Sequence, residues 1–146
     1  YQEHSMPDQP VEHFLSNMNR LNSANINSVL DKVYAEHVTF IDPVKQIDGR
    51  DKLSHYFTEL YRGVERCQFT LKHSVCQDQH YVMEWQMTLR HKQLAKHRDI
   101  VVDGISVLHY AADRVTYQRD YYDLGAMIYE QVPLLGGLIK KIRHGL

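Results

Sequence analysis

The stretch Arg119-Asp120-Tyr121-Tyr122-Asp123-Leu124 ends a predicted strand and leads into a predicted helix. Alternation along that strand places two sets of side chains on opposite faces. One face carries Thr116, Gln118, Asp120 and Tyr122, and the other carries Val115, Tyr117, Arg119 and Tyr121. A carboxylate among tyrosines is costly in a core and is more typical of a functional site. Asp123 has a simpler interpretation as the N-cap of the helix, whereas Asp120 lies too early in the chain for capping.

The rest of the chain has the composition of one ordinary globular domain. Its 146 residues are 43% hydrophobic and 24% charged, and the formal net charge is -1. These values fit a single domain with a sizeable core and give no indication of a nucleic-acid partner. The ten histidines show neither HxH nor HExxH spacing, so we expect no metal site and no other cofactor.

The cysteines and the hydropathy bear on where the protein works. Cys67 and Cys76 fall in one extended run with opposite parity, so we expect them on opposite faces and without a disulfide. Free thiols suit a reducing cytoplasm. The sequence has neither an apolar run of membrane-spanning length nor a signal-peptide pattern at its start. We therefore expect a cytoplasmic protein.

Apolar residues at helical spacing predict three helices in the first half of the chain. The first covers 10–21, the second covers 26–33, and the third covers 50–63 after the turn Asp48-Gly49. Residues 1–9 are expected to be a tail that is either disordered or derived from an expression tag.

A short strand lies between the second and third helices. Val38, Phe40 and Asp42 share one of its faces, and Pro43 ends it. On a buried face, the charge of Asp42 must be paired, solvated in a cavity or suppressed by a raised pKa. The alternative is that Asp42 begins a turn with Pro43, as Asp-Pro pairs often do.

Strands fill the second half of the chain as far as Tyr122. Two of them, 66–75 and 81–90, alternate apolar and polar residues as half-buried antiparallel strands do. The strand 99–110 is apolar on both faces, which is typical of a sheet centre covered on both sides. Helices followed by long antiparallel strands indicate an α+β fold, with the helices packed on one face of a curved sheet.

The end of the chain carries an amphipathic pattern of its own. A short helix is predicted from Leu124 to about Val132, and residues 133–146 set leucine and isoleucine against lysine and arginine. We expect this basic amphipathic segment to dock its apolar side on its own domain or on a dimer partner. Contact with a membrane surface is the alternative interpretation.

Two segments of the chain resemble a known superfamily. They are Tyr34-Ala35-Glu36-His37-Val38-Thr39-Phe40-Ile41-Asp42-Pro43 and Asp48-Gly49-Arg50-Asp51. Both are similar to the early signature of the nuclear transport factor 2-like superfamily, in its SnoaL-like branch, and the resemblance extends over about 11–124. It implies a cone, in which a curved antiparallel sheet wraps around a pocket and N-terminal helices close it. The SnoaL-like domain would then cover 10–132.

Enzymes of the superfamily imply roles for the two aspartates. Asp42 falls on the general base of ketosteroid isomerase, whose tyrosine falls near Met18 and whose protonated aspartate falls near Ile105, with Asp103 displaced from that position. The electrophilic half of the isomerase site is therefore not visible. Asp120 falls on the water-activating aspartate of limonene epoxide hydrolase, in a nearly identical Arg-Asp-Tyr-aromatic-Asp-Leu segment.

The hydrolase resemblance covers one of five catalytic positions. The hydrolase's partner arginine and second aspartate fall on Trp85 and Met87, and its tyrosine and asparagine fall on Phe40 and Asp42. SnoaL-type polyketide cyclases, the third enzyme class of this resemblance, use a pocket aspartate as acid and base, and this chain is compatible with that arrangement.

Strand parity and the resemblance together predict a pocket with two carboxylates. The catalytic candidates are Asp42 and Asp120, and the predicted lining is Phe40, Trp85, Met87, Gln118 and Tyr122. Two carboxylates near one apolar cavity can split their pKa values, so that one acts as a base and the other as a neutral donor. Such a pair can move a proton on a carbon acid or activate a water.

Two functions stay open at this point. One is acid/base catalysis of isomerase, cyclase or hydrolase type on a small, mostly apolar molecule; the other is a non-catalytic ligand-binding or dimeric interaction module. Both aspartates in one closed cavity would favour the enzyme, and an aspartate paired with Arg119 at the surface would favour the module. Tyr117, Tyr121 and the second apolar face of 100–107 predict a homodimer formed through the sheet.

Overall fold

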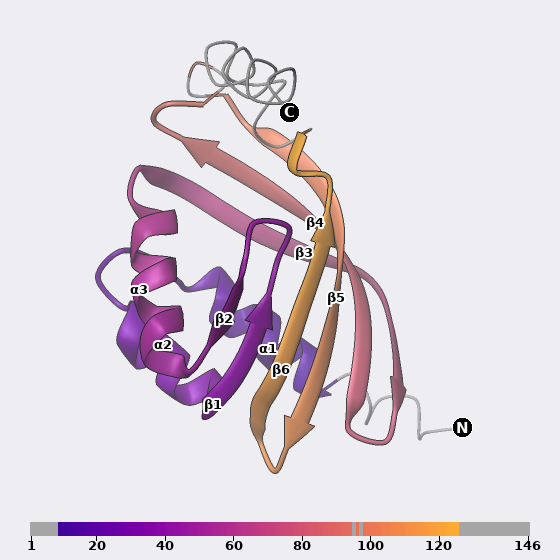
Figure 1. Cartoon of the computed structure of the whole chain (residues 1–146). Coiled ribbons are helices and arrows are strands. Elements are labelled where there is room, and N and C mark those ends of the chain that lie inside the picture. The colour runs from indigo at the N-terminus through magenta and orange to yellow at the C-terminus, as the bar shows by residue number, and fades with distance from the viewer. Residues whose placement is uncertain (1–8, 95, 97, 126–146) are drawn as a thin grey trace, which may run out of the picture.

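The computed structural model describes residues 9–94, 96 and 98–125. Within these residues the chain forms three helices and one curved sheet of six strands (Figure 1). The strands lie in the order β2-β1-β6-β5-β4-β3 across the sheet. The helices cover the concave face, and the apolar core lies between the two layers. This is the α+β architecture that the sequence predicts.

Each helix presents an apolar stripe to the sheet, as its residue spacing predicts. α1 covers Gln9–Asn19, α2 covers Ile26–Val33 and α3 covers Arg50–Tyr61. The side chains that they bury include Val11, Phe14, Leu15, Met18, Ile26, Val29, Leu30, Val33, Leu53 and Phe57. α3 follows Gly49, whose φ of 99° lies in a region that L side chains rarely adopt.

The first strand pairs differently from the prediction. β1 (Tyr34–Ile41) pairs antiparallel with a short strand, β2 (Gln46–Asp48), which the sequence did not reveal. On its other edge β1 runs parallel to β6 (Arg114–Tyr122). The sheet is therefore mixed rather than purely antiparallel, and the fold class is otherwise as predicted.

The parallel pair explains how the two candidate aspartates meet. Its register sets Phe40 opposite Gln118. Two residues further along the same pair, Asp42 comes beside Asp120. Segments separated by about half of the chain therefore meet at one end of the sheet.

Three long antiparallel strands complete the sheet: β3 (Val64–Gln77), β4 (His80–His91) and β5 (Ile100–Ala111). Alternation predicts the inward side chains of β4 correctly, and these are Tyr81, Met83, Trp85, Met87 and Leu89. The register shifts at several points in the sheet, and two of these bulges, one in β3 and one in β6, each correct a prediction.

The bulge in β3 reverses the expected relation of the cysteines. The register against β4 shifts between Leu71 and His73. Cys67 lies opposite Leu89 before the shift, and Cys76 lies opposite Tyr81 after it, so both point to the concave face. The prediction that the two cysteines lie on opposite faces is therefore wrong, because the extra residue of a bulge moves every later side chain of the strand to the other face. Both cysteines are free thiols, since nine residues of extended chain hold them roughly 30 Å apart.

The second bulge lies at the start of β6. The register against β5 shifts after the His109–Tyr117 pair, which leaves Thr116 as the extra residue. Val115 and Gln118 are consequently both buried, although simple alternation put them on opposite faces. From Gln118 onward the predicted parity holds, because the extra residue lies before this part of the strand.

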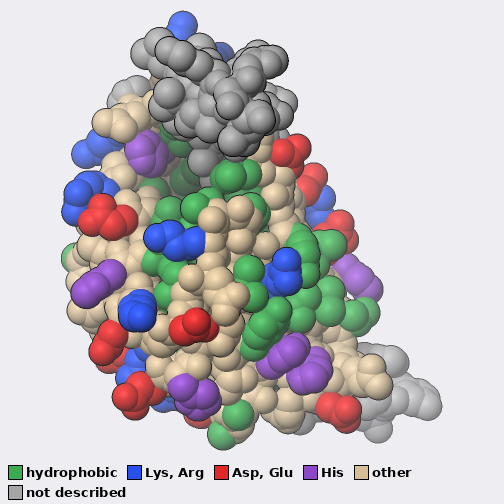
Figure 2. Space-filling view, in the orientation of Figure 1, with side chains coloured by type: hydrophobic (Ala, Val, Ile, Leu, Met, Phe, Trp, Pro, Cys, Tyr) green, Lys and Arg blue, Asp and Glu red, His purple; other side chains and the backbone are tan. Residues whose placement is uncertain are grey.

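The convex side of the long strands is called the outer face here, and it exposes apolar side chains (Figure 2). Val82, Val101, Ile105 and Tyr121 are between 40% and 56% accessible. The sequence predicts that β5 is covered on both sides, but the outer side of β5 is open in the single chain. The predicted helix 124–132 and the basic segment 133–146 lie outside the described residues, apart from Leu124 and Gly125.

Candidate active site

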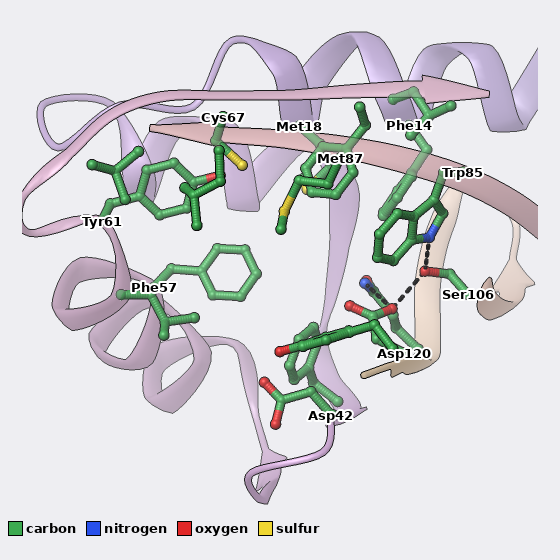
Figure 3. Close-up of a pocket in the computed structure, with 18 of the residues that line it drawn as sticks. Phe14, Met18, Asp42, Phe57, Tyr61, Cys67, Trp85, Met87, Ser106 and Asp120 are labelled. Carbon is green, nitrogen blue, oxygen red and sulfur yellow. Dashed lines mark hydrogen bonds between the residues drawn. The ribbon is translucent and has the colours of Figure 1, made fainter. Parts of the chain in front are cut away.

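A cavity of about 280 Å³ lies between the concave face and the helices (Figure 3). Its lining is mostly aromatic, aliphatic and sulfur-containing. The described residues that line it are Phe14, Leu15, Met18, Phe40, Asp42, Phe57, Leu60, Tyr61, Val64, Cys67, Phe69, Met83, Trp85, Met87, Leu89, His91, Leu94, Ser106, Gln118, Asp120 and Tyr122. All seven residues predicted for the site are among them.

The polar groups gather at one end of this cavity. Asp42, Asp120 and Ser106 lie together in Figure 3, while Tyr61 and Cys67 lie at the opposite end. Burial raises the pKa of the Cys67 thiol to about 11, so this thiol stays protonated near neutral pH. The cavity therefore has one polar, anionic end and one apolar end.

Asp120 reaches the cavity because of its place on β6. It lies directly opposite Ser106 of β5, and side chains opposite one another in a sheet share a face. Ser106 donates a 2.6 Å hydrogen bond to Asp120 Oδ1, and Gln118 Nε2 donates a second at 3.0 Å. One oxygen of the carboxylate is thus held by two donors.

Buried side chains hold these two donors in place. The indole N–H of Trp85 donates to Ser106 Oγ at 2.9 Å, and the hydroxyl of Tyr34 donates to Gln118 Oε1 at 2.6 Å. Trp85 can lie across β5 because Gly104 has no side chain there: a Cβ at Gly104 would be 2.2 Å from the indole. A polar network with every member paired is rigid, so Asp120 Oδ1 has a fixed position.

The second oxygen of Asp120 is open to the cavity. Oδ2 accepts no hydrogen bond from any described residue. Over the same residues, no fully buried side-chain oxygen or nitrogen lacks a partner. Oδ2 must therefore be accessible from the space that Asp120 lines, which is the cavity and a smaller open hollow beside Pro43 and Arg119.

The environment of Asp120 favours its neutral form. Desolvation by burial is the largest cause and raises the pKa of Asp120 from 3.8 to about 6. The hydrogen bonds from Ser106 and Gln118 lower the pKa, and the charge of Asp42 raises it. The carboxyl group therefore gains and loses its proton close to neutral pH, which suits a general acid or base.

Asp42 occupies a different environment. Its contacts match the interpretation in which Asp42 begins a turn with Pro43. Asp42 Oδ1 accepts hydrogen bonds from the backbone N–H groups of Val44 at 2.8 Å and Lys45 at 3.0 Å. Asp42 Oδ2 accepts one from the Tyr56 hydroxyl at 2.5 Å. Both oxygens are thus engaged in holding the β1–β2 turn and α3, although the residue still lines the cavity.

Two tyrosines add hydroxyl donors near the carboxylates. Burial and the hydrogen bond to Asp42 raise the pKa of Tyr56, so its hydroxyl stays protonated. Burial also raises the pKa of Tyr122, and the charges of Asp42 and Asp120 raise it further. The Tyr122 hydroxyl donates to no described residue and lines the cavity. As far as the described residues extend, it is therefore an unengaged donor at the anionic end.

Ser106 and Tyr56 are the site residues that sequence reasoning missed. Ser106 is the only serine of β5, and its inward parity with Val102 and Leu108 was a signal that could have identified it. Tyr56 follows the spacing of the apolar residues of α3, Leu53, Phe57 and Leu60, so the sequence pattern alone gives its hydroxyl no role. The sequence does not show that Tyr56 on α3 and Asp42 after β1 come within hydrogen-bond distance of each other.

The geometry does not match the interpretation in which Asp42 or Asp120 pairs with Arg119 at the surface. Arg119 forms no ion pair with either one; its guanidinium lies 5.0 Å from the ring centre of Tyr121. Asp103, near the second carboxylate position of ketosteroid isomerase, lies on the outer face and forms a 2.8 Å ion pair with Lys72. That pair and the bond from Gln86 lower the pKa of Asp103. Asp103 therefore takes no part in the cavity.

A family model of the SnoaL-like domain matches residues 11–118. The chain belongs to the SnoaL-like domain family. The match includes the helices, β1 to β5, and β6 as far as Gln118, so Asp120 lies just beyond it. No curated protein sequence matches this SnoaL-like chain significantly.

Solved structures have the same fold at low sequence identity. A protein from Catenulispora acidiphila with a ketosteroid isomerase-like fold, in complex with trimethylamine, is 17% identical, with a TM-score of 0.72 over 86% of this chain and 92% of that one. A proposed SnoaL-like polyketide cyclase from Shewanella denitrificans is 19% identical, with a TM-score of 0.70 over 84% and 93%.

An epoxide hydrolase of Mycobacterium tuberculosis, similar to limonene epoxide hydrolase, shares the fold as well. It is 16% identical, with a TM-score of 0.67 over 94% of this chain and 96% of that one. At such identities the likeness shows the architecture of this SnoaL-like chain and not its activity. In the part of the chain that is described, no helix is long and apolar enough to cross a bilayer, and no three potential ligands could hold a metal ion.

Proposed function

We propose that this SnoaL-like chain is an enzyme that moves a proton on a small, mostly apolar carbon acid, as isomerases and cyclases do. The observation that carries the proposal is the open Oδ2 of Asp120. It belongs to a carboxyl group with a pKa of about 6, fixed by its other oxygen and facing an apolar cavity. A positioned group that titrates near the working pH is what general acid/base catalysis requires.

The proposed step involves two side chains. Ionised Asp120 takes a proton from the carbon between a carbonyl group and a C=C bond; the electron pair of that C–H bond forms a new C=C bond, and the π pair of the carbonyl group moves onto its oxygen to give a dienolate. The Tyr122 hydroxyl donates a hydrogen bond to this developing oxyanion. Return of the proton from Asp120 to the far carbon of the dienolate re-forms the carbonyl group and gives the conjugated isomer. Asp42 acts through its charge and by holding the turn, because its own oxygens are engaged.

Water activation of the epoxide hydrolase type receives less support from the lining. The positions of the hydrolase's arginine and second aspartate carry Trp85 and Met87, and both line the cavity. No arginine or lysine is among the described lining residues to orient the second aspartate or to polarise an epoxide. We therefore favour proton transfer at carbon over hydrolysis.

A non-catalytic ligand-binding module is the second candidate. The observation in its favour is that Asp42, at the position of the isomerase general base, is committed to the turn. Under this candidate the cavity binds the same class of molecule without turnover. Its homodimeric form and a location in the cytoplasm, which the free thiols suit, remain proposals under both candidates.

Deuterium exchange separates these two candidates. The protein is incubated in D₂O with small cyclic ketones, both with and without an amino group, and exchange next to the carbonyl is followed by NMR. We expect accelerated exchange for at least one ketone, and a loss of about 10²-fold or more in Asp120→Asn. Asp103→Asn removes an equal charge from the outer face and should keep the rate. Equal exchange by the parent protein and Asp120→Asn would contradict the enzyme.

A further inference from the structure

The carboxylates of the cavity have no positive partner among the described residues that line it. His91 is the sole candidate for a positive charge in that lining. It lies eight positions along β4 from Met83, the residue level with Ser106 and Asp120, which corresponds to roughly 25 Å of strand. Its two ring nitrogens are occupied by the carbonyl of Arg62 and the N–H of Gln93.

Two basic side chains of the described residues, Lys45 and Arg119, border the anionic end without lining the cavity. Lys45 Nζ lies 5.0 Å from the ring centre of Tyr56, whose hydroxyl binds Asp42. Arg119 borders the smaller hollow, and its guanidinium lies over Tyr121. Asp42 is the charged group that acts on Asp120, and it has the same sign. The ionised form of Asp120 therefore has no counter-charge from the described part of the chain within the cavity.

A desolvated anion without a counter-charge has two ways to be stabilised: it binds a proton, or it binds a cation. Oδ2 of Asp120 can accept a charge-assisted hydrogen bond from an ammonium group. Aromatic rings of Phe40, Trp85 and Tyr122 line the same cavity, and the faces of such rings attract cations. The apolar end, at Phe57, matches a hydrocarbon body.

We propose that the cavity takes an organic cation: an amine on a compact hydrocarbon body, whose nitrogen donates to one lone pair of Asp120 Oδ2 and leaves the other lone pair for the proton transfer. The proposal rests on the cavity being a ligand site, as the proposed function requires, and it names the class of ligand. Near 280 Å³, the cavity is at the lower end of ligand pockets and suits a molecule of one or two rings. An amine of this kind is positively charged at neutral pH and needs no protein cation beside it.

The single tryptophan of the chain gives a direct readout, because Trp85 lines the cavity. Its fluorescence is titrated at pH 8 with benzylamine and with benzyl alcohol, which have nearly the same shape. We expect the amine to bind at least tenfold more tightly. Between pH 8 and pH 5 its affinity should fall, since protonation of Asp120 removes the acceptor charge while the amine stays charged. The affinity for the alcohol should stay constant.

Two variants locate the effect. Asp120→Asn should bring benzylamine down to the affinity of benzyl alcohol. Asp103→Asn, with the same change in net charge on the outer face, should bind benzylamine as the parent does. Equal affinity of the two probes, equal effects of the two variants, or no binding of either probe would each overturn the proposal. The pH titration of the parent protein needs no variant, so a folding defect of Asp120→Asn cannot mask the result.

The outcome is independent of the exchange experiment. If neutral ketones exchange deuterium but benzylamine binds no more tightly than benzyl alcohol, the organic-cation proposal is overturned and the proposed enzyme activity is retained. If benzylamine binds tightly through Asp120 but no ketone exchanges, the enzyme proposal is overturned and the organic-cation proposal is retained.

Discussion

At the scale of single residues, the two aspartates of the cavity have opposite relations to stability. Asp120 is desolvated, and only one of its oxygens is hydrogen-bonded. Asp42 accepts three hydrogen bonds and holds a turn. Removing the charge of one should therefore help folding, and removing the side chain of the other should harm it.

Asp120→Asn should stabilise the protein above pH 6. The pKa of Asp120 is raised from 3.8 to about 6 in the folded state, so folding binds a proton and stability falls as pH rises between these values. Asparagine has no charge at any of these pH values, so the variant does not lose this stability as pH rises. We expect a gain of about 1–3 kcal/mol at pH 7.5, discounted for the partial accessibility of the residue, and little change at pH 3.5. Urea unfolding at both pH values measures it; a uniform loss near 1 kcal/mol would indicate a capping role instead.

Asp42→Ala should destabilise the protein by about 2–3 kcal/mol, because two backbone N–H groups and the Tyr56 hydroxyl lose their acceptor. Asp42→Asn keeps one acceptor oxygen and should lose less. Thermal melts compare both with the parent protein. Tyr56→Phe is the matched control for the hydroxyl bond, and it should lower stability by less than Asp42→Ala does. A stable Asp42→Ala would show that the turn does not depend on the carboxylate.

Residue-level prediction succeeded where alternation is unbroken. Phe40, Trp85, Met87, Gln118 and Tyr122 line one cavity because their strands keep the period of two near these positions. It failed at Val115 and at Cys76, since each lies beyond an extra residue. A bulge depends on how a strand pairs with its neighbour, and a single sequence does not contain that register.

At the scale of elements, the antiparallel pairing of β4 with β5 fixes the site. Trp85 lies opposite Gly104, and its indole covers the position that a side chain would take. The same indole holds Ser106, which holds Asp120. The packing of two strands thus determines where the carboxylate lies.

Gly104→Ala tests this packing. The added methyl group would meet the indole at 2.2 Å, so Trp85 must move and lose its bond to Ser106. We expect destabilisation by about 1–3 kcal/mol and a red shift of Trp85 emission. Val101→Ala, at an exposed position of the same strand, should change neither. An unshifted emission spectrum in Gly104→Ala would contradict the role of the glycine.

The parallel pairing of β1 with β6 is the element-level feature that the sequence did not reveal. The two strands are separated by most of the domain, and local patterns carry no information on such a partner. The resemblance to the superfamily supplied the cone shape, and the pairing supplied the reason why Asp42 and Asp120 meet in it.

At the scale of the whole molecule, the outer face remains to be assigned. Val82, Val101, Ile105 and Tyr121 expose apolar surface on one side of the sheet, and contiguous patches of this kind mark interaction sites. The prediction of a homodimer through the sheet therefore stands as a prediction, with about 800 Å² from each copy needed for a stable interface.

Sedimentation velocity at micromolar concentration should give the mass of a dimer. Ile105→Glu should shift it toward the monomer, because a charge would be buried in the interface. Val44→Glu is the matched control, since Val44 is 54% exposed in the β1–β2 turn and away from the outer face. A monomeric parent protein, or equal effects of the two substitutions, would contradict the dimer.

The unequal oxygens of Asp120 have a stereochemical consequence. Oδ1 is held by Ser106 and Gln118, and Oδ2 alone faces the open space. In the proposed reaction a proton would leave and return on one side of the bound molecule, because one oxygen has to perform both transfers. The process would be suprafacial, and any new chiral carbon would form with a single handedness. The chain would thus impose its own handedness on the product through one hydrogen-bonded carboxylate.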